Sequence, residues 1–156
     1  MKINYLLILV CAFISACGQG VQNNEMLLAE VADSFCVRYF NYDFVGAGKY
    51  CTDDSRKWLR FAASNVTEKD LEILYGQETP ARIEITDVAY HEPDSTALVT
   101  VVVEDYWDMD VIGQENDELT LTHHRVGVFK FPLVRQQEKW KIRMEDLPRS
   151  GKRSHD

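Results

Sequence analysis

The sequence of 156 residues predicts an α+β fold in which short helices come first and four antiparallel strands follow. Two patterns support this class. Before Pro80, apolar residues recur at steps of three and four, as the buried face of a helix requires. After Pro80, apolar and polar residues alternate in runs that turn-forming segments separate, which is typical of strands joined by hairpins. The length is sufficient for one domain with a hydrophobic core.

The helical half divides into successive segments. The first helix is expected to begin at Glu25, and its apolar face repeats along residues 28–39. A short helical segment is expected around 43–50. Another helix is predicted after Thr52, because acidic residues in a first turn interact favourably with the helix dipole.

The last predicted helix carries capping residues at both ends. Thr67 is the expected N-cap, and Asp70 occupies the third helical position, where a capping box usually has Glu or Gln. Gly76 is expected to end the helix.

The strand half has four runs, and its final run shows the clearest alternation. There Trp140, Ile142 and Met144 alternate with basic residues, which indicates one buried and one solvated face. The predicted strands cover residues 81–91, 96–110, 118–131 and 139–146.

The chain opens with the pattern of a secretory signal peptide. Lys2 provides a positive start, and residues 5–14 form an uncharged apolar run. A membrane-spanning helix needs about 20 apolar residues, so this run is too short to span. Residues 1–16 are therefore predicted to be a cleaved leader.

The end of this leader, Ile14-Ser15-Ala16-Cys17, resembles the lipobox of bacterial lipoproteins. The resemblance implies diacylglycerol on the Cys17 thiol, further fatty acylation such as palmitate, and attachment to a membrane. Gly18 is not the aspartate that is associated with inner-membrane retention, so the outer membrane is favoured. The alternative is an ordinary signal peptide with a coincidental cysteine. Residues 17–24 would form a tether, 25–148 the domain and 149–156 a flexible tail.

Charge and cysteine content limit the class of protein further. With 17 basic and 25 acidic residues the net charge is −8, which argues against a nucleic-acid partner. Cys36 and Cys51 remain in the mature chain. They are expected either to form a disulfide, worth about 3 kcal/mol in the loop-entropy model, or to be two buried free thiols.

The order of elements resembles the nuclear transport factor 2-like superfamily, also called the ketosteroid-isomerase-like cone fold. Two segments carry the resemblance, "YFNYDFVGAGKYCTDDSRKWLRFAASN" and "KWKIRMEDLPRSGK". They look like a branch of small envelope lipoproteins of unassigned activity. The resemblance implies N-terminal helices packed on a curved four-stranded antiparallel sheet. The superfamily hosts enzymes, adaptors and scaffolds, and its members are often homodimers, so the fold leaves the function open.

The best catalytic candidates lie on the central hairpin. If its loop centres on Gln114, Asp105 lies opposite His123, and Arg125 lies on the same face one pair away. A carboxylate beside an imidazole would raise the histidine pKa and form an acid/base pair. The alternative is a structural ion pair at the rim of the sheet. A shift of register by one residue would place Asp105 and His123 on opposite faces.

Aromatic residues are candidates for lining an apolar ligand pocket, with ordinary core packing as the alternative. Neither the adjacent histidines 123 and 124 nor the carboxylates near the hairpin loop have metal-site spacing, so no metal is predicted. No cofactor motif is present. The aromatic candidates are Tyr39, Tyr42, Trp58 and Trp107.

Three functions follow from these features. The leading prediction is a lipid-anchored envelope domain that binds a small apolar ligand or an envelope protein without catalysis. The second is an isomerase- or hydratase-like enzyme that uses Asp105 and His123. The third is a structural subunit whose cone is filled by its own side chains.

Overall fold

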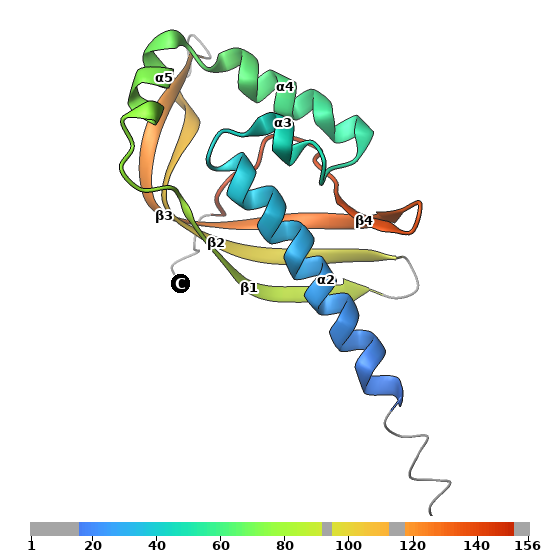
Figure 1. The fold of residues 1–156 in the computed structure, drawn as a ribbon. Helices are drawn as coiled ribbons and strands as arrows, with labels where there is room; N and C mark the ends of the chain where they lie inside the picture. Colours follow the sequence, from blue (N-terminus) through green and yellow to red (C-terminus); the bar gives the residue numbers. More distant parts are fainter. Residues whose placement is uncertain (1–15, 92–94, 113–117, 152–156) are drawn as a thin grey trace, which may run out of the picture.

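The predicted fold class is confirmed: helices pack on one face of a curved, four-stranded antiparallel sheet with strand order β1-β2-β3-β4 (Figure 1). The structure is a computed structural model that describes residues 16–91, 95–112 and 118–151. Its elements are α2 (Ala16–Tyr39), α3 (Phe44–Ala47), η1 (Asp53–Ser55), α4 (Arg56–Asn65), α5 (Glu68–Tyr75), β1 (Arg82–His91), β2 (Thr96–Ile112), β3 (Glu118–Gln136) and β4 (Lys139–Ile142).

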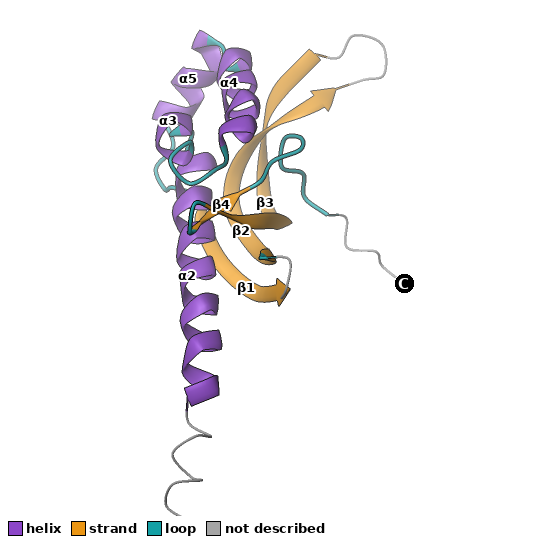
Figure 2. Ribbon diagram, turned by 90° about the vertical axis from the view of Figure 1, so that its right-hand side faces the viewer, coloured by secondary structure: helices purple, strands orange, loops and turns teal. Residues whose placement is uncertain are grey.

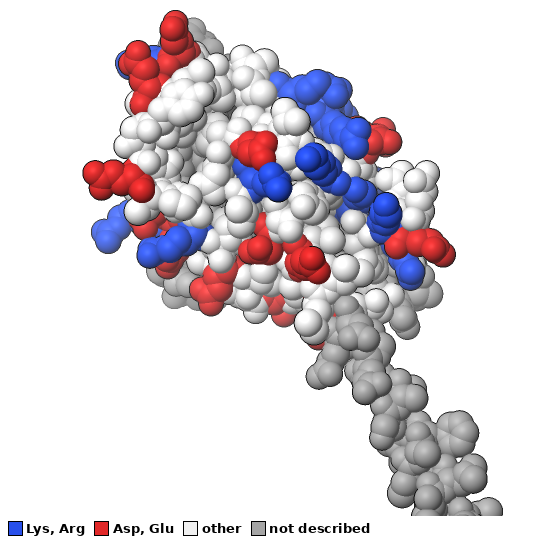
Figure 3. All heavy atoms as spheres, in the orientation of Figure 1, with Lys and Arg blue, Asp and Glu red and all other residues white. Residues whose placement is uncertain are grey.

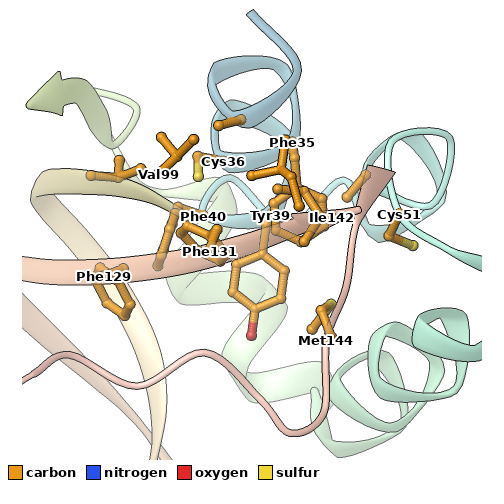
Figure 4. Packing of buried hydrophobic residues seen from close by; sticks show 14 of the residues in the cluster. Phe35, Cys36, Tyr39, Phe40, Cys51, Val99, Phe129, Phe131, Ile142 and Met144 are labelled. Atoms are coloured by element: carbon orange, nitrogen blue, oxygen red, sulfur yellow. The ribbon is translucent and has the colours of Figure 1, made fainter. Parts of the chain in front are cut away.

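The main core lies between α2 and the sheet, which form two layers (Figures 1 and 2). Phe35 of α2 packs edge-on against Phe131 of β3, with ring centroids 5.5 Å apart. Phe40, just after α2, packs against Phe129 at 4.7 Å. Figure 4 shows these rings gathered beneath the helix. The fully buried residues follow the predicted periods, with Leu28, Ala32 and Phe35 on α2 and Val99, Val101 and Val103 on β2.

Hydrogen bonds to β4 hold the segment that leads into α4. Thr52 N donates to Ile142 O, and Ile142 N donates to Tyr50 O, both at 2.9 Å. The buried Ser55 hydroxyl accepts from Met144 N at 2.8 Å. These bonds place the start of α4 beside β4, the edge strand of the sheet.

The short helix α5 begins and ends as predicted. Thr67 Oγ1 accepts from Asp70 N, and Asp70 Oδ2 accepts from Thr67 N at 2.8 Å, so the capping box is complete. The helix ends before Gly76. No side chain of α5 is buried, so its local bonds rather than packing define it.

Strands β2 and β3 extend beyond the rest of the sheet. The pairing of β1 with β2 ends at Arg82↔Glu104, whereas β2 and β3 stay paired as far as Ile112↔Glu118. We call residues 105–112 of β2 and 118–125 of β3 the outer ribbon. It begins at Asp105, whose φ of 51° is in the left-handed region.

Several predicted boundaries are wrong. Strand β3 continues to Gln136 rather than ending at residue 131, and β4 ends at Ile142 rather than at residue 146. Helix α2 begins at Ala16 rather than Glu25, so the expected tether of residues 18–24 is helical. Extending an existing helix adds one bond per residue and avoids the cost of nucleation. The expected tail from 149 is also partly bound, because Gly151 N donates to Val128 O at 2.8 Å and Ser150 Oγ accepts from Val128 N at 3.1 Å.

The predicted leader lies mostly outside the described residues, which begin at Ala16, and so does the environment of the Cys17 thiol. Lipidation therefore stays a prediction. Within the described residues, no helix is both long and apolar enough to cross a membrane.

Cys36 and Cys51 are free thiols, so the disulfide alternative is wrong. Both side chains are buried, at 0% and 1% exposure, in the core around α2 and β4. Burial disfavours the thiolate and raises the pKa of both, and the nearby Asp33 adds to the effect at Cys36. They are packed side chains rather than nucleophiles.

Candidate functional site: a cavity beside the outer ribbon

A cavity of about 1020 Å³, open to solvent, lies between α4, the outer ribbon and the segment that follows β4. Trp58 and Phe61 of α4 form one wall, and Tyr106 and His124 of the ribbon form the opposite wall. Residues 146–150 close a third side. Because α2 ends at Tyr39, it does not fill this end of the sheet as it fills the other.

The ribbon wall is built on a pair of stacked rings. Tyr106 and His124 are directly opposite one another, and their rings stack with centroids 5.1 Å apart and an interplanar angle of 20°. Tyr106 is 2% exposed and also packs on Phe40 and Phe129, each at 5.4 Å. The tyrosine thus joins the cavity wall to the main core.

Gly127 is required for this arrangement. A Cβ at this position would clash with the Tyr106 hydroxyl and would lie 2.8 Å from Phe129 Cε2. The missing side chain therefore leaves the space that the tyrosine ring occupies.

The left-handed backbone of Asp105 decides which residues face the cavity. Val99, Val101 and Val103 are buried on alternate positions, but the next buried residue is Tyr106 rather than residue 105. The positive φ of Asp105 interrupts the alternation, although β2 and β3 keep the same register on both sides of it, with Glu104 opposite Val126 and Tyr106 opposite His124. Aspartate tolerates a left-handed φ better than most residues, so the position suits the sequence.

The predicted Asp105–His123 pair is wrong. The hairpin register is displaced by two residues, so that His123 lies opposite Trp107 and Val103 lies opposite Gly127 rather than Arg125. Asp105 instead accepts a hydrogen bond from Arg82 at 3.0 Å. His123 packs on Trp107, with ring centroids 5.1 Å apart. Arg125 is exposed.

Asp105, Trp107 and His123 do line one hollow of about 560 Å³, between the outer ribbon and the C-terminal end of α5. No hydrogen bond joins Asp105 to His123 in the described part of the chain. The Asp105 carboxylate belongs to an exposed ion pair with Arg82, whose guanidinium also contacts Glu104 at 2.9 Å. Such pairs contribute little to stability.

The aromatic candidates separate into two groups. Tyr39, Tyr42 and Trp107 line a pit of only about 10 Å³, which is about the space of one water molecule. Trp58 lines the large cavity. Its Nε1 atom is buried and has no hydrogen-bond partner among the described residues.

Two carboxylates, Asp108 and Asp146, lie near the small pit and the large cavity. Burial raises the pKa of Tyr39 well above its ordinary value, and Asp108, Tyr42 and Asp146 add to the effect. Asp108 and Asp146 also line the large cavity. Aromatic walls, one imidazole and these carboxylates are suited to holding a small molecule with an apolar body and a polar end. Among the described residues, no group of three or more His, Cys, Asp or Glu side chains could hold a metal ion.

Tyr106, Asp108 and His124 are not among the site residues predicted from the sequence, although one signal in the sequence points to this place. An isolated glycine in a strand marks a bulge or a close approach of neighbouring groups. Gly127 is such a glycine, and it lies near the position where the facing strand changes its parity.

Fold and cavity together define the class of protein: an α+β domain whose helices cover a curved sheet and leave an open cavity at one end. Comparison with protein-family models finds no match, and comparison with curated proteins finds none either.

Solved structures with a similar arrangement do exist. A protein of unknown function from Mycobacterium tuberculosis has a TM-score of 0.49 and 17% identity, over 86% of this chain and 76% of that one. A nuclear transport factor 2-like protein from Streptomyces avermitilis, provisionally described as a dehydratase, has a TM-score of 0.44 and 17% identity over 78% and 92%. A nuclear transport factor 2-like protein involved in plasmid conjugation has a TM-score of 0.37 and 14% identity, over 78% of this chain and 46% of that one. Likeness at this level concerns the fold and carries no argument about activity.

Proposed function

We propose that this chain is a lipid-anchored envelope protein whose domain binds a small ligand, without catalysis, in the cavity beside the outer ribbon. The observation that carries the binding proposal is the cavity of about 1020 Å³ between α4 and the ribbon. Ligand sites are concave, mostly apolar and provided with a few polar groups. The stacked Tyr106 and His124 rings and the half-buried Asp108, all of which line the cavity, meet that description.

The two alternatives have less support. The enzyme hypothesis depended on a direct Asp105–His123 pair, whereas His123 lies opposite Trp107 and Asp105 accepts a hydrogen bond from Arg82. The structural hypothesis requires a cone filled by its own side chains, whereas only the part beneath α2 is filled. A homodimer and an envelope protein partner stay predictions.

The anchor is supported by the position of Ile14-Ser15-Ala16-Cys17 directly after the apolar run. Two or more acyl chains would hold the domain firmly, because each buried methylene contributes about 0.8 kcal/mol. We expect a radiolabelled or clickable fatty acid to be incorporated into the wild type but not into Cys17→Ser. Equal incorporation would contradict the anchor and leave the cavity proposal untouched.

Ligand binding can be tested with a pair of neighbouring substitutions on α4. Ser64 and Asn65 both donate side-chain hydrogen bonds to Phe61 O, at 2.8 and 2.7 Å. Asn65 lines the cavity, and Ser64 is exposed and does not. Asn65→Trp therefore fills the cavity, whereas Ser64→Trp adds the same ring outside it.

The probe is anilinonaphthalene sulfonate, added to the full-length Cys17→Ser chain and followed by its fluorescence. We expect binding by the parent and by Ser64→Trp, and binding at least about tenfold weaker for Asn65→Trp, a loss of about 1.4 kcal/mol. Equal affinity for the two tryptophan variants would place the probe elsewhere. Absence of binding to the parent would overturn the proposed ligand class.

A further inference from the structure

A second concave feature lies on the opposite side of α4, between this helix and α3. This groove of about 400 Å³ is lined by Phe44 and Val45 of α3 and by Leu59 and Ala63 of α4. Leu59 is buried, but Val45 is 85% exposed, which is unusual for a large apolar side chain at the edge of a groove. The groove therefore has an apolar floor that the protein leaves partly open.

Three cations surround this floor. Arg56 and Arg60 are one helical turn apart on α4, so they project from the same face. Lys49 approaches from the turn after α3. Figure 3 shows Lys and Arg side chains gathered over the α4 side of the molecule, whereas the α5 side carries acidic ones. In a chain with a net charge of −8, this is a local reversal of sign.

The cations differ in how they are held. Arg56 Nε donates to Gly48 O at 3.2 Å, and its Nη1 lies 3.2 Å from Asp53 Oδ1, so this guanidinium has a defined position. Arg60 and Lys49 form no ion pair with any residue that the structure describes. Hydrogen bonds from Gly46 N and Arg38 lower the pKa of Asp43, with a smaller contribution from Lys49, and the Asp43 carboxylate is paired with Arg38 at 2.6 Å. In the described part of the chain, neither of these two charges beside the apolar floor is held in an ion pair with an acidic side chain.

We propose that this groove binds a single-chain anionic amphiphile, with a phosphate monoester head against Arg60 and Lys49 and an alkyl chain along Val45 and Leu59. Charge complementarity selects the head, because Arg and Lys form strong charge-assisted hydrogen bonds with phosphate oxygens. The open apolar floor selects the chain, because burying methylene groups there removes them from water. An ordinary solvated helix face would carry the cations but would have no open apolar surface beside them.

This site is independent of the proposed cavity. Trp58, Phe61 and Asn65 line the cavity, whereas Arg56, Arg60 and Ala63 line the groove. The two sets follow opposite faces of one helix. A ligand in one site does not require a ligand in the other.

The test measures the affinity of decyl phosphate for the full-length Cys17→Ser chain by calorimetry, below the concentration at which micelles form. Decanol, decyltrimethylammonium and inorganic phosphate are the comparison probes. We expect decyl phosphate to bind at least about tenfold more tightly than each of the three. Equal affinity for inorganic phosphate would show that the floor has no role, and equal affinity for decanol would show that the cations have none. Either result overturns the proposal.

A matched pair of substitutions locates the site. Arg60→Gln should weaken decyl phosphate binding about tenfold, and Arg60→Lys should retain part of the affinity. Lys57→Gln is the control, because Lys57 is a neighbouring α4 cation that lies over the Trp58 ring, 5.2 Å from its centroid, and does not line the groove. Equal losses for Arg60→Gln and Lys57→Gln would mean general electrostatic attraction and would overturn the groove.

The cavity-filling Asn65→Trp variant separates this proposal from the proposed function. It should lose anilinonaphthalene sulfonate and keep decyl phosphate, whereas Arg60→Gln should do the reverse. Loss of decyl phosphate in Asn65→Trp alone would assign the amphiphile to the cavity and overturn the groove.

Discussion

The two ends of strands β2 and β3 have similar alternating sequences but different environments. Beneath α2, Val99, Val101 and Val103 are fully buried, and Phe129 and Phe131 pack against aromatic side chains from the helix and the residues after it. On the outer ribbon, Asp108 and His124 are half-buried around an open cavity. The filled end lies beneath the long helix α2, whereas the open end lies beyond it, where the alternation of the strand changes at the positive φ of Asp105.

The two ends of β2 and β3 differ in the helices that cover them. Helix α2 has 24 residues and packs against β1, β2 and β4. Above the ribbon lie α4, with 10 residues, and α5, which buries no side chain. Helix α2 contributes Leu28, Ala32 and Phe35 to the core, whereas α4 buries Leu59 and Ala62 and α5 buries no side chain.

The largest difference between the two ends should appear on removal of an aromatic ring. Phe35→Ala removes a fully buried ring beneath α2 and should lower the free energy of unfolding by about 3–5 kcal/mol. Phe61→Ala removes a ring from the cavity wall that is already 47% exposed, and should cost about 1 kcal/mol or less. Urea unfolding followed by circular dichroism measures both. Equal losses would remove the distinction between a filled end and an open end.

The next effect concerns the junction of the two ends. Gly127→Ala would place a methyl group against Tyr106 and Phe129, and overpacking of this kind costs about 1–3 kcal/mol. Gly151→Ala is the control, since its nearest neighbour would be Val128 O at 3.8 Å. Displacement of Tyr106 should also change the NMR signals of the His124 ring. An unchanged His124 spectrum would contradict the dependence of the wall on Gly127.

The closed end should also make the protein sensitive to alkali. Burial raises the folded-state pKa of Cys36 and Tyr39 above their ordinary values of 9.0 and 10.0. Below pH 9 both groups are protonated in the folded and unfolded states, so stability is retained. At higher pH the unfolded state ionises first, and each group lowers the free energy of unfolding by up to about 1.4 kcal/mol per pH unit until its folded-state pKa is reached.

Denaturant unfolding between pH 8 and pH 11 measures this slope. Cys36→Ala starts from a lower stability but should lose less of it between pH 9 and pH 10. A slope identical to that of the wild type would show that the Cys36 thiol does not contribute.

The smallest effect should be confined to the open end. Thr67→Ala removes the N-cap of α5, a change worth about 1 kcal/mol. Because no α5 side chain is buried, we expect faster amide hydrogen exchange in this helix with little change in the core amides beneath α2. A uniform increase across the protein would show that α5 is part of the main cooperative unit.

Local sequence patterns were sufficient to predict the helices and strands, but they were not sufficient to predict which residues form the candidate site. The capping box at Thr67 and the buried Trp140, Ile142 and Met144 depend on neighbours in the chain, and both predictions are confirmed. The Asp105–His123 pair depended on the hairpin register and on regular alternation through residue 105. The register differs by two residues and the alternation breaks at the positive φ of Asp105.

The oxidation state of Cys36 and Cys51 was also not predictable from local patterns, because their spacing along the chain allows either a disulfide or two free thiols. The distance between the two sulfur atoms depends on how α2 lies relative to the segment before η1, where Cys51 pairs with Ile142 of β4. Spacing along the chain does not determine that distance.

The sequence by itself determined the class of fold, the order and type of its elements and the faces that they bury, because periodicity and capping act over a few residues. The tertiary structure alone decided that Tyr106 and His124, one position beyond the expected pair, face the cavity. It also decided that Ser150 and Gly151 bind Val128 rather than remain a tail. These outcomes depend on which backbone edges and side chains meet across the sheet, which is a property of the assembled fold.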